Sequence, residues 1–208
     1  MASGSESSEA GRLEGLWAGE FGDAYIERNP ILHEGRAPFW ESLVARHGIG
    51  SVLEVGCGQG GNLMRMLPLM PPDRIWGVDV NATAVERARA NAPGTNVVQS
   101  SARQLPFRDR FVDLSYTVGV LIHQAEEALP DVLGEIVRCS NRFVLWCEYF
   151  APQTEEVPYH GETGTLFRRD YGAIYASLFP DLTVVEEGYL ESEAWDRGTW
   201  QLLRRPEA

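Results

Sequence analysis

The segment Ser51–Asn62 has the residue types and spacing most able to do chemistry in this sequence. An apolar run at 51–55 leads into closely spaced glycines, and an apolar helical pattern at 60–68 follows them. Glycines after a strand let the backbone turn tightly and approach a ligand where a Cβ would clash. The segment therefore predicts a cofactor-binding loop. Its glycines are Gly56, Gly58, Gly60 and Gly61.

The residue that separates two possible cofactors is Glu54, two positions before the first glycine. The spacing Gly56-x-Gly58-x-x-Gly61 also satisfies the dinucleotide fingerprint, in which a helix N-terminus receives a pyrophosphate. A carboxylate beside a pyrophosphate would repel it, whereas it suits an ammonium or sulfonium group. We therefore favour a cationic cofactor, and an NAD-dependent dehydrogenase is the alternative.

The pattern Glu-x-Gly-x-Gly-x-Gly at 54–60 resembles the first motif of the class I S-adenosylmethionine-dependent methyltransferases. The resemblance implies S-adenosyl-L-methionine as cofactor and S-adenosyl-L-homocysteine as product. No metal is expected, because the four histidines are scattered without ligand spacing. It places Glu54, Gly56, Gly58 and Gly60 at the cofactor, with Cys57 between them as a small filler residue.

Further cofactor contacts are expected at the ends of the next two strands. Asp79 follows the loop by about twenty residues, where an acid accepts hydrogen bonds from ribose hydroxyls, and Val80 would flank the adenine. Ser101 stands where many family members have Asp, and the resemblance places its hydroxyl and the Ala102 backbone at the adenine.

The fourth and fifth strands are expected to supply the methyl-transfer site. Ligands bind outside the carboxyl ends of strands in an open α/β sheet, so Thr117 and Val118 should face the methionine part of the cofactor. His123 follows near the expected methyl group, and Glu148 and Tyr149 end the fifth strand. If the acceptor is a hydroxyl, His123 is the expected base. If it is an amine or guanidine, Glu148 would orient the cation.

Several segments outside these motifs resemble the pseudaminic acid biosynthesis-associated methylases, over about residues 16 to 204. This resemblance implies a small-molecule acceptor, such as a sugar, aminosugar or amine-type metabolite; a natural-product pathway is equally compatible. The segments are Trp17–Asp23 with Arg28–Asn29, Gly119–His123, Ser140–Arg142, Cys147–Tyr149, Pro158–Gly161 and Leu166–Asp170.

Two segments are expected to cover the site. The stretch 150–165 has no secondary-structure pattern, and such long loops are often lids, so Tyr159 and His160 are expected at the acceptor. The N-terminal segment 12–48 reads as a helical cap, interrupted at Gly19 and Gly22. Its Trp17 and Tyr25 would close over the cofactor and acceptor.

The bulk properties narrow the class of protein. The net charge is −12, and the sequence lacks the basic region with which a nucleic-acid enzyme binds phosphates. Neither a membrane span nor a secretion signal is recognisable, and three cysteines without metal spacing indicate a reducing cytoplasm. Residues 1–11 read as a disordered tail. A non-catalytic protein that binds the cofactor as a sensor or partner subunit is a further alternative.

The remaining chain, 12–208, alternates strand and helix patterns as one doubly wound α/β domain. Strands are expected at 51–55, 74–79, 95–99, 111–117, 142–149, 182–190 and 198–204. Helices are expected near 60–68, 83–91 and 128–138. The last two strands leave no room for a helix between them and should form an antiparallel hairpin. The prediction is a mostly parallel, seven-stranded, Rossmann-like methyltransferase sheet with an N-terminal helical cap.

Overall fold

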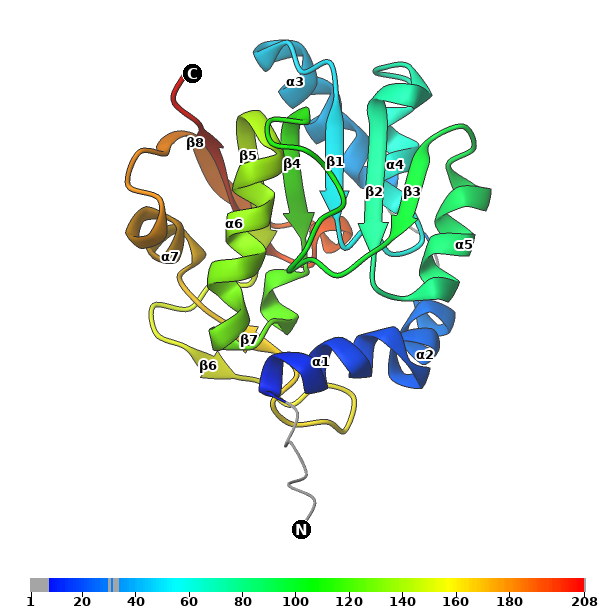
Figure 1. The fold of residues 1–208 in the computed structure, drawn as a ribbon, viewed down its shortest axis with the longest axis vertical. Coiled ribbons are helices and arrows are strands. Elements are labelled where there is room, and N and C mark those ends of the chain that lie inside the picture. The colour runs from blue at the N-terminus through cyan, green and yellow to red at the C-terminus, as the bar shows by residue number, and fades with distance from the viewer. Residues whose placement is uncertain (1–7, 30, 32–33, 208) are drawn as a thin grey trace.

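A computed structural model describes residues 8–29, 31 and 34–207 of the chain. Its centre is a seven-stranded sheet in the order β3-β2-β1-β4-β5-β9-β8 (Figure 1). β1 to β5 run parallel, whereas β9 is antiparallel to both β5 and β8. The strands are β1 (Val52–Val55), β2 (Ile75–Asp79), β3 (Asn96–Gln99), β4 (Val112–Val118), β5 (Ser140–Glu148), β8 (Thr183–Leu190) and β9 (Gly198–Arg204).

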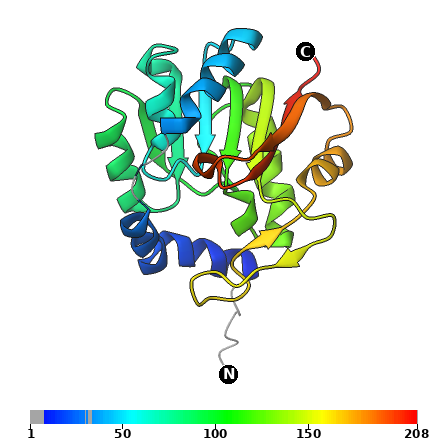
Figure 2. The ribbon, with the colours of Figure 1, turned by 180° about the vertical axis from the view of Figure 1, so that it is seen from behind.

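Helices cover both faces of the sheet because the strands carry apolar side chains on both sides. In β1, Leu53 and Val55 pack into one core with α6 (Leu129–Cys139) and α7 (Tyr171–Leu178). Val52 faces the opposite core, which contains residues of three other helices. These are α3 (Ala37–His47), α4 (Gly61–Met66) and α5 (Ala82–Asn91). Figures 1 and 2 show the two layers from opposite sides.

The sheet places a crevice at its carboxyl edge. β1 lies between β2 and β4. After β1 the chain continues to β2 on one side, and after β4 it continues to β5 on the other side. Open α/β sheets bind ligands at the point where the strand order reverses in this way. The N-terminal helices α1 (Glu9–Ala18) and α2 (Glu20–Arg28) lie across this edge (Figure 1). They meet at Gly19, and a Cβ on Gly22 would lie 1.9 Å from the Trp17 carbonyl oxygen, so this turn requires glycine.

The expected strands, the C-terminal antiparallel pair and the α/β class are confirmed. The tail boundary is wrong, because Ser8 caps α1 and residues 9–11 are its first turn; residues 1–7 lie outside the described residues. The segment 150–165 contains β6 (Glu155–Glu156), which pairs with β7 (Phe167–Arg168). Helix α7 was not expected.

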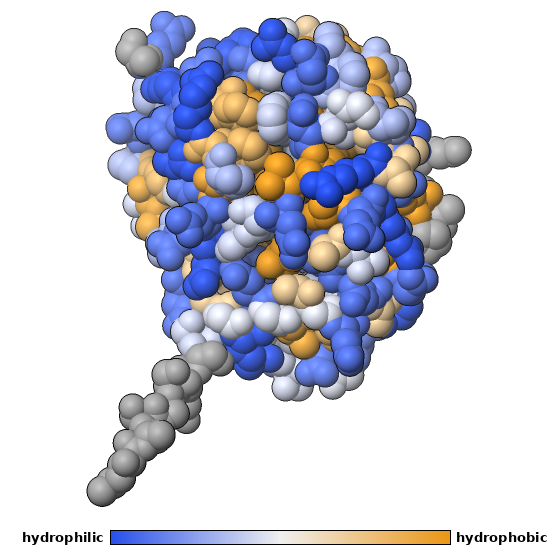
Figure 3. Space-filling view, turned by 45° about the vertical axis from the view of Figure 1, so that its right-hand side comes forward, coloured by the Kyte–Doolittle hydropathy of each residue, from blue (hydrophilic) through white to orange (hydrophobic). Residues whose placement is uncertain are grey.

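Short 3-10 turns occupy Glu34–Arg36, Pro72–Arg74, Leu121–His123, Glu126–Ala128 and Glu193–Trp195. Among the described residues, no helix has the length and apolar character needed to cross a membrane. Figure 3 shows a face on which hydrophilic residues predominate and hydrophobic residues gather in smaller patches between them.

Candidate functional site

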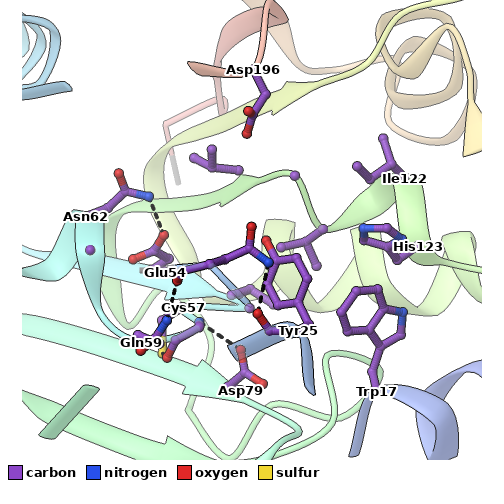
Figure 4. Close-up of a pocket in the computed structure, with 18 of the residues that line it drawn as sticks. Trp17, Tyr25, Glu54, Cys57, Gln59, Asn62, Asp79, Ile122, His123 and Asp196 are labelled. Atoms are coloured by element: carbon purple, nitrogen blue, oxygen red, sulfur yellow. Dashed lines mark hydrogen bonds between the residues drawn. The ribbon is translucent and has the colours of Figure 1, made fainter. Parts of the chain in front are cut away.

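A pocket of about 790 Å³ lies at the crevice, between the strand ends and the N-terminal helices. Figure 4 shows Glu54 and Asp79 on one side of it, with Trp17 and His123 on the other. Most of the residues singled out from the sequence line this pocket. They are Trp17, Tyr25, Glu54, Gly56, Cys57, Gly58, Asp79, Val80, Ala102, Val118, His123, Glu148, Tyr149 and Tyr159.

The glycine loop is bound to the end of β2. The backbone amides of Gly56 and Cys57 both donate to the Val78 carbonyl, at 2.8 and 2.9 Å. Gly58 has a φ of +51°, and within the described part of the chain a Cβ there would meet no atom within 4 Å. The loop therefore leaves open space beside Gly58, where a ligand can reach the backbone. Burial raises the pKa of Cys57 well above its ordinary value, which keeps the thiol protonated.

Gly60, which was expected at the cofactor, does not line the pocket and instead allows close packing of two helices. It precedes α4 with a φ of +82°, and a Cβ would lie 3.1 Å from the Ala88 Cα of α5. Glycine thus allows α4 and α5 to approach closely.

Asp79 organises the loop from the end of β2. Its Oδ2 accepts a hydrogen bond from the Gly58 amide at 2.8 Å, and its Oδ1 accepts one from the Asn81 amide at 2.9 Å. Asn81 caps α5 through the Ala84 amide and donates from Nδ2 to the Trp17 carbonyl at 3.2 Å. One asparagine therefore connects the N-terminal cap to the strand that carries Asp79.

Glu54 is buried, with 2% of its surface exposed. Its Oε1 accepts a hydrogen bond from Asn62 Nδ2 at 2.6 Å, and its Oε2 accepts one from the Tyr116 hydroxyl at 3.2 Å. Burial raises the pKa of the Glu54 carboxyl to about 8, although the Asn62 hydrogen bond and the Arg36 charge oppose this rise.

Arg36 is a site residue that the sequence analysis missed. It lines the pocket, donates from Nη1 to Asn62 Oδ1 at 3.1 Å and from Nε to the Ala194 carbonyl at 2.5 Å. Its guanidinium lies 4.7 Å from the Trp195 ring centroid. A buried cation thus stands near the Glu54 carboxyl, which can supply the opposite charge to a zwitterionic group once it loses its proton.

His123 is buried against the N-terminal cap and the 150–165 segment. Its ring centroid lies 4.3 Å from Trp17 and 5.2 Å from Tyr159. Nδ1 lies 2.7 Å from the Thr165 carbonyl oxygen, which can only accept, so Nδ1 carries the proton and Nε2 has the free lone pair. Burial lowers the pKa of His123 to about 4, so the ring is neutral near pH 7.

Glu148 lies in the pocket wall with 1% of its surface exposed. Its two carboxylate oxygens accept backbone amides of Val120 and Ile122 at 3.1 and 3.3 Å. It therefore ties β5 to the segment that carries His123. Burial raises the pKa of Glu148 to about 7. Thr117, which was expected at the methionine part, is fully buried beneath this region and does not line the pocket.

Two further residues that were expected at the ligands do not line the pocket. Ser101 does not line the pocket, because its hydroxyl donates to Glu14 Oε2 at 2.5 Å. His160 is exposed at a turn with a φ of +48°, and its ring packs against Tyr159 outside the pocket lining. Within the described residues, no group of three or more His, Cys, Asp or Glu is placed to hold a metal ion.

Comparison with known proteins agrees with this geometry. Residues 52–142, from β1 into β5, match a family described as methyltransferase domain. Phthiotriol/phenolphthiotriol dimycocerosates methyltransferase 1 of Mycobacterium ulcerans is 34% identical over 92 residues, which are 42% of this chain. The match spans only 32% of that relative's length.

Solved structures resemble the whole fold. Magnesium protoporphyrin IX methyltransferase from Synechocystis PCC 6803, with bound S-adenosylmethionine, has a TM-score of 0.71 at 13% identity, covering 98% of this chain and all of that one. Burkholderia thailandensis 1,6-didemethyltoxoflavin-N1-methyltransferase, with bound 1,6-didemethyltoxoflavin and S-adenosylhomocysteine, has a TM-score of 0.72 at 14% identity. That alignment covers 98% and 93% of the two chains. The architecture is therefore the Rossmann-like methyltransferase fold.

Proposed function

We propose that this chain is an S-adenosylmethionine-dependent methyltransferase that acts on a small-molecule acceptor. The observation that carries the proposal is that one pocket contains two groups of residues suited to different parts of a ligand. Asp79 and the open space at Gly58 suit a nucleoside, and the Glu54–Arg36 pair suits an amino-acid group. The match of residues 52–142 to methyltransferase domains supports the same conclusion.

The residues present fit this cofactor. Each Asp79 oxygen accepts one backbone hydrogen bond and keeps a lone pair, so the carboxylate can still accept from ribose hydroxyls. Glu54 would face the ammonium group and Arg36 the carboxylate group of the methionine part. A dinucleotide pyrophosphate fits less well, because the buried Glu54 carboxyl stands two residues before the loop.

The chain's own contribution to the reaction is alignment and proton removal. The bound cofactor supplies an electrophilic methyl group on sulfur. The protein must hold the acceptor atom about 3–3.5 Å from that carbon, in line with the bond that breaks. His123 is suited to take a proton from an acceptor hydroxyl, because the Thr165 carbonyl holds it in the tautomer with Nε2 unprotonated. Its low basicity is sufficient because a hydroxyl becomes strongly acidic as its oxygen gains the methyl group.

The acceptor would occupy the part of the pocket beyond His123, near the tyrosines Tyr25, Tyr149 and Tyr159. We assign Glu148 a positioning role toward His123, because its oxygens are bound to backbone amides. The 150–165 segment would act as the acceptor lid, since Thr165 and Tyr159 both contact His123. The resemblance noted in the sequence suggests a sugar, aminosugar or natural-product acceptor.

Ligand-dependent thermal stability tests the cofactor assignment. A ligand at a hundredfold its dissociation constant stabilises a protein by about 2.7 kcal/mol. We expect this shift with S-adenosylmethionine and S-adenosylhomocysteine and none with NAD or NADP. A shift with the nicotinamide cofactors alone would overturn the assignment in favour of a dehydrogenase.

Acceptor screening tests catalysis itself. Sugar nucleotides, aminosugars and small amines are incubated with S-adenosylmethionine, and methylated products are sought by mass spectrometry. We expect S-adenosylhomocysteine release that depends on one acceptor class. Tight cofactor binding without turnover on any acceptor would favour a cofactor-binding sensor or partner subunit instead.

A further inference from the structure

The outer end of the pocket lies beside the segment that follows β3. β3 is the neighbour of β2 at the sheet edge, and Ser100 and Ala102 line the pocket just beyond it. A ribose held by Asp79 at the end of β2 leaves its base to extend toward this edge. The region that would contact the base is therefore bounded by residues 100–102 and by residues of the N-terminal helical cap.

The cap places Glu14 there. Glu14 of α1 lines the pocket, and its Oε2 accepts hydrogen bonds from Ser101 Oγ at 2.5 Å and from Arg103 Nε at 3.3 Å. Two side chains from one loop thus fix a carboxylate that comes from a distant helix. Its side chain is about one-third exposed, so the group remains accessible from the pocket.

The helix that carries Glu14 is itself held in place at two points. The Ala10 amide donates to Glu127 Oε1 at 2.9 Å, and the Trp17 carbonyl accepts from Asn81 Nδ2 at 3.2 Å. These contacts lie on either side of Glu14 along α1. The carboxylate is therefore preorganised over the loop.

The hydrogen-bonding capacity left at this place matches adenine. The hydrogen bonds from Ser101 and Arg103 to the Glu14 carboxylate both end on Oε2, whereas an ionised carboxylate offers about four acceptor sites on its two oxygens. Within the described part of the chain, the Ala102 amide donates no hydrogen bond. Glu14 and Ala102 both line the pocket, and an acceptor on one with a donor on the other complements the 6-amino group and N1 of adenine but mismatches the keto oxygen and N1–H of hypoxanthine.

We propose that Glu14 is the specificity residue for the cofactor's base and accepts a hydrogen bond from the adenine amino group. Ser101, which the sequence analysis placed at the adenine, acts instead through Glu14 by holding its carboxylate. This proposal rests on the proposed function, because it requires the nucleoside to bind in this pocket. It makes α1 part of the cofactor site, so the cap must be in place for the base to be recognised.

Two ligands that differ only at the base test the proposal. S-adenosylhomocysteine and S-inosylhomocysteine carry the same net charge, so calorimetric dissociation constants compare the amino group with the keto group directly. We expect the native protein to prefer the adenine ligand by about tenfold or more, since a mismatched pair leaves polar groups unsatisfied. Glu14→Gln should reduce this preference severalfold, because an amide can turn its donor or its acceptor toward the base, whereas the Ala102 amide continues to favour N1 of adenine.

Glu20→Gln is the matched control, since Glu20 is an exposed acid of the same cap that does not line the pocket. It should keep the native preference. Ser101→Ala keeps the carboxylate but removes one anchor, so its preference should fall between the native and Glu14→Gln values; it also replaces Glu14→Gln if that variant does not fold.

The outcomes separate the possible errors. Equal weakening of both ligands by Glu14→Gln would mean that Glu14 only docks α1, and it would overturn the proposal while leaving the proposed function intact. A native protein that binds both ligands equally would also overturn it. A native protein that binds neither would reject the proposed function as well.

Discussion

Asn62 Nδ2 donates a 2.6 Å hydrogen bond to Oε1 of Glu54, two buried side chains on either side of the glycine loop. The same amide accepts at Oδ1 from Arg36 Nη1 at 3.1 Å and from Trp40 Nε1 at 3.3 Å. The first helix after the loop is thereby connected to the strand before it and to the region around α3. One asparagine side chain therefore connects the buried Glu54 carboxyl to the Arg36 guanidinium.

We expect Asn62→Ala to lower both stability and cofactor affinity. The substitution leaves the Arg36 and Trp40 donors without their Asn62 acceptor and Glu54 with one partner fewer, and an unsatisfied buried polar group costs about 1–3 kcal/mol. S-adenosylhomocysteine affinity should fall about tenfold because Glu54 and Arg36 lose their alignment. Urea denaturation and calorimetry measure the two effects. Asn141→Ala, at an exposed position of β5, is the control, and equal behaviour of the two variants would refute the role of Asn62.

The raised pKa of Glu54 predicts that the ligand-free protein loses stability with rising pH. Its folded pKa is about 8, above the ordinary value of 4.5. The folded state therefore binds the proton more tightly, and its contribution is complete below about pH 4.5 and is lost as pH rises through about 8. We expect Glu54→Gln to flatten this pH dependence, as measured by the free energy of unfolding in urea. Identical pH profiles for both proteins would contradict the assignment.

Cofactor binding should release a proton from Glu54. A cationic ligand group favours the ionised carboxylate, so binding lowers the pKa of Glu54 from about 8 and the proton leaves. Affinity for S-adenosylmethionine should therefore rise between pH 6 and 8 and then level off. Calorimetry at pH 7 in buffers of different ionisation enthalpy measures the released proton. Glu148 also has a raised pKa, so only the part of the signal that Glu54→Gln removes counts as support.

Gly58 and Gly60 should separate binding from folding. Both have positive φ, but a Cβ at Gly58 points into open space, whereas one at Gly60 meets Ala88 at 3.1 Å. Gly58→Ala should lower the free energy of unfolding by about 1 kcal/mol and weaken S-adenosylhomocysteine binding at least about tenfold. Gly60→Ala should cost about 2–4 kcal/mol from backbone strain plus overpacking. Thermal denaturation and calorimetry on both variants measure the two effects. Unchanged S-adenosylhomocysteine binding by Gly58→Ala would contradict a role of Gly58 in binding.

The sequence predicted the parts of the site that are determined by residues close together in the chain. The glycine spacing and the acid at the end of β2 depend on residues close together in the chain, and the C-terminal antiparallel strands followed from the short connection between them. Helix α7 was missed because Tyr171–Leu178 is short and largely apolar, without a polar face to indicate helical periodicity.

The remaining site residues depend on distant contacts. Arg36 reaches the Ala194 carbonyl, and Glu14 reaches Ser101 across 87 positions of sequence. No spacing rule connects such residues, because their proximity exists only after the sheet has formed and the cap has packed on it. Thr117 and His160 lie outside the pocket lining for the converse reason. Thr117 lies near the end of β4 and His160 within a loop, as expected, but the direction of a side chain is decided by packing.

His123→Ala should lower turnover much more than it lowers cofactor affinity. The Thr165 carbonyl holds Nδ1–H, so Nε2 is the basic atom available to the pocket. Loss of a general base typically reduces turnover by about 10²–10⁴-fold. The pKa of His123 is lowered to about 4, so the ring stays neutral above about pH 5 and native turnover should show no His123 titration between pH 6 and 8.

Steady-state kinetics with the acceptor found by screening, together with calorimetry for S-adenosylhomocysteine, make this comparison. His160→Ala is the matched control, because that histidine is exposed and lies outside the pocket lining; its turnover should change less than about twofold. His123→Asn retains a polar group that can donate to Thr165 but cannot act as a base, so it should preserve the fold and remain slow. Parallel losses of turnover and cofactor affinity in His123→Ala would instead assign His123 to packing against Trp17, whose ring centroid lies 4.3 Å away. An unimpaired His123→Asn enzyme would point to an amine acceptor that needs no base.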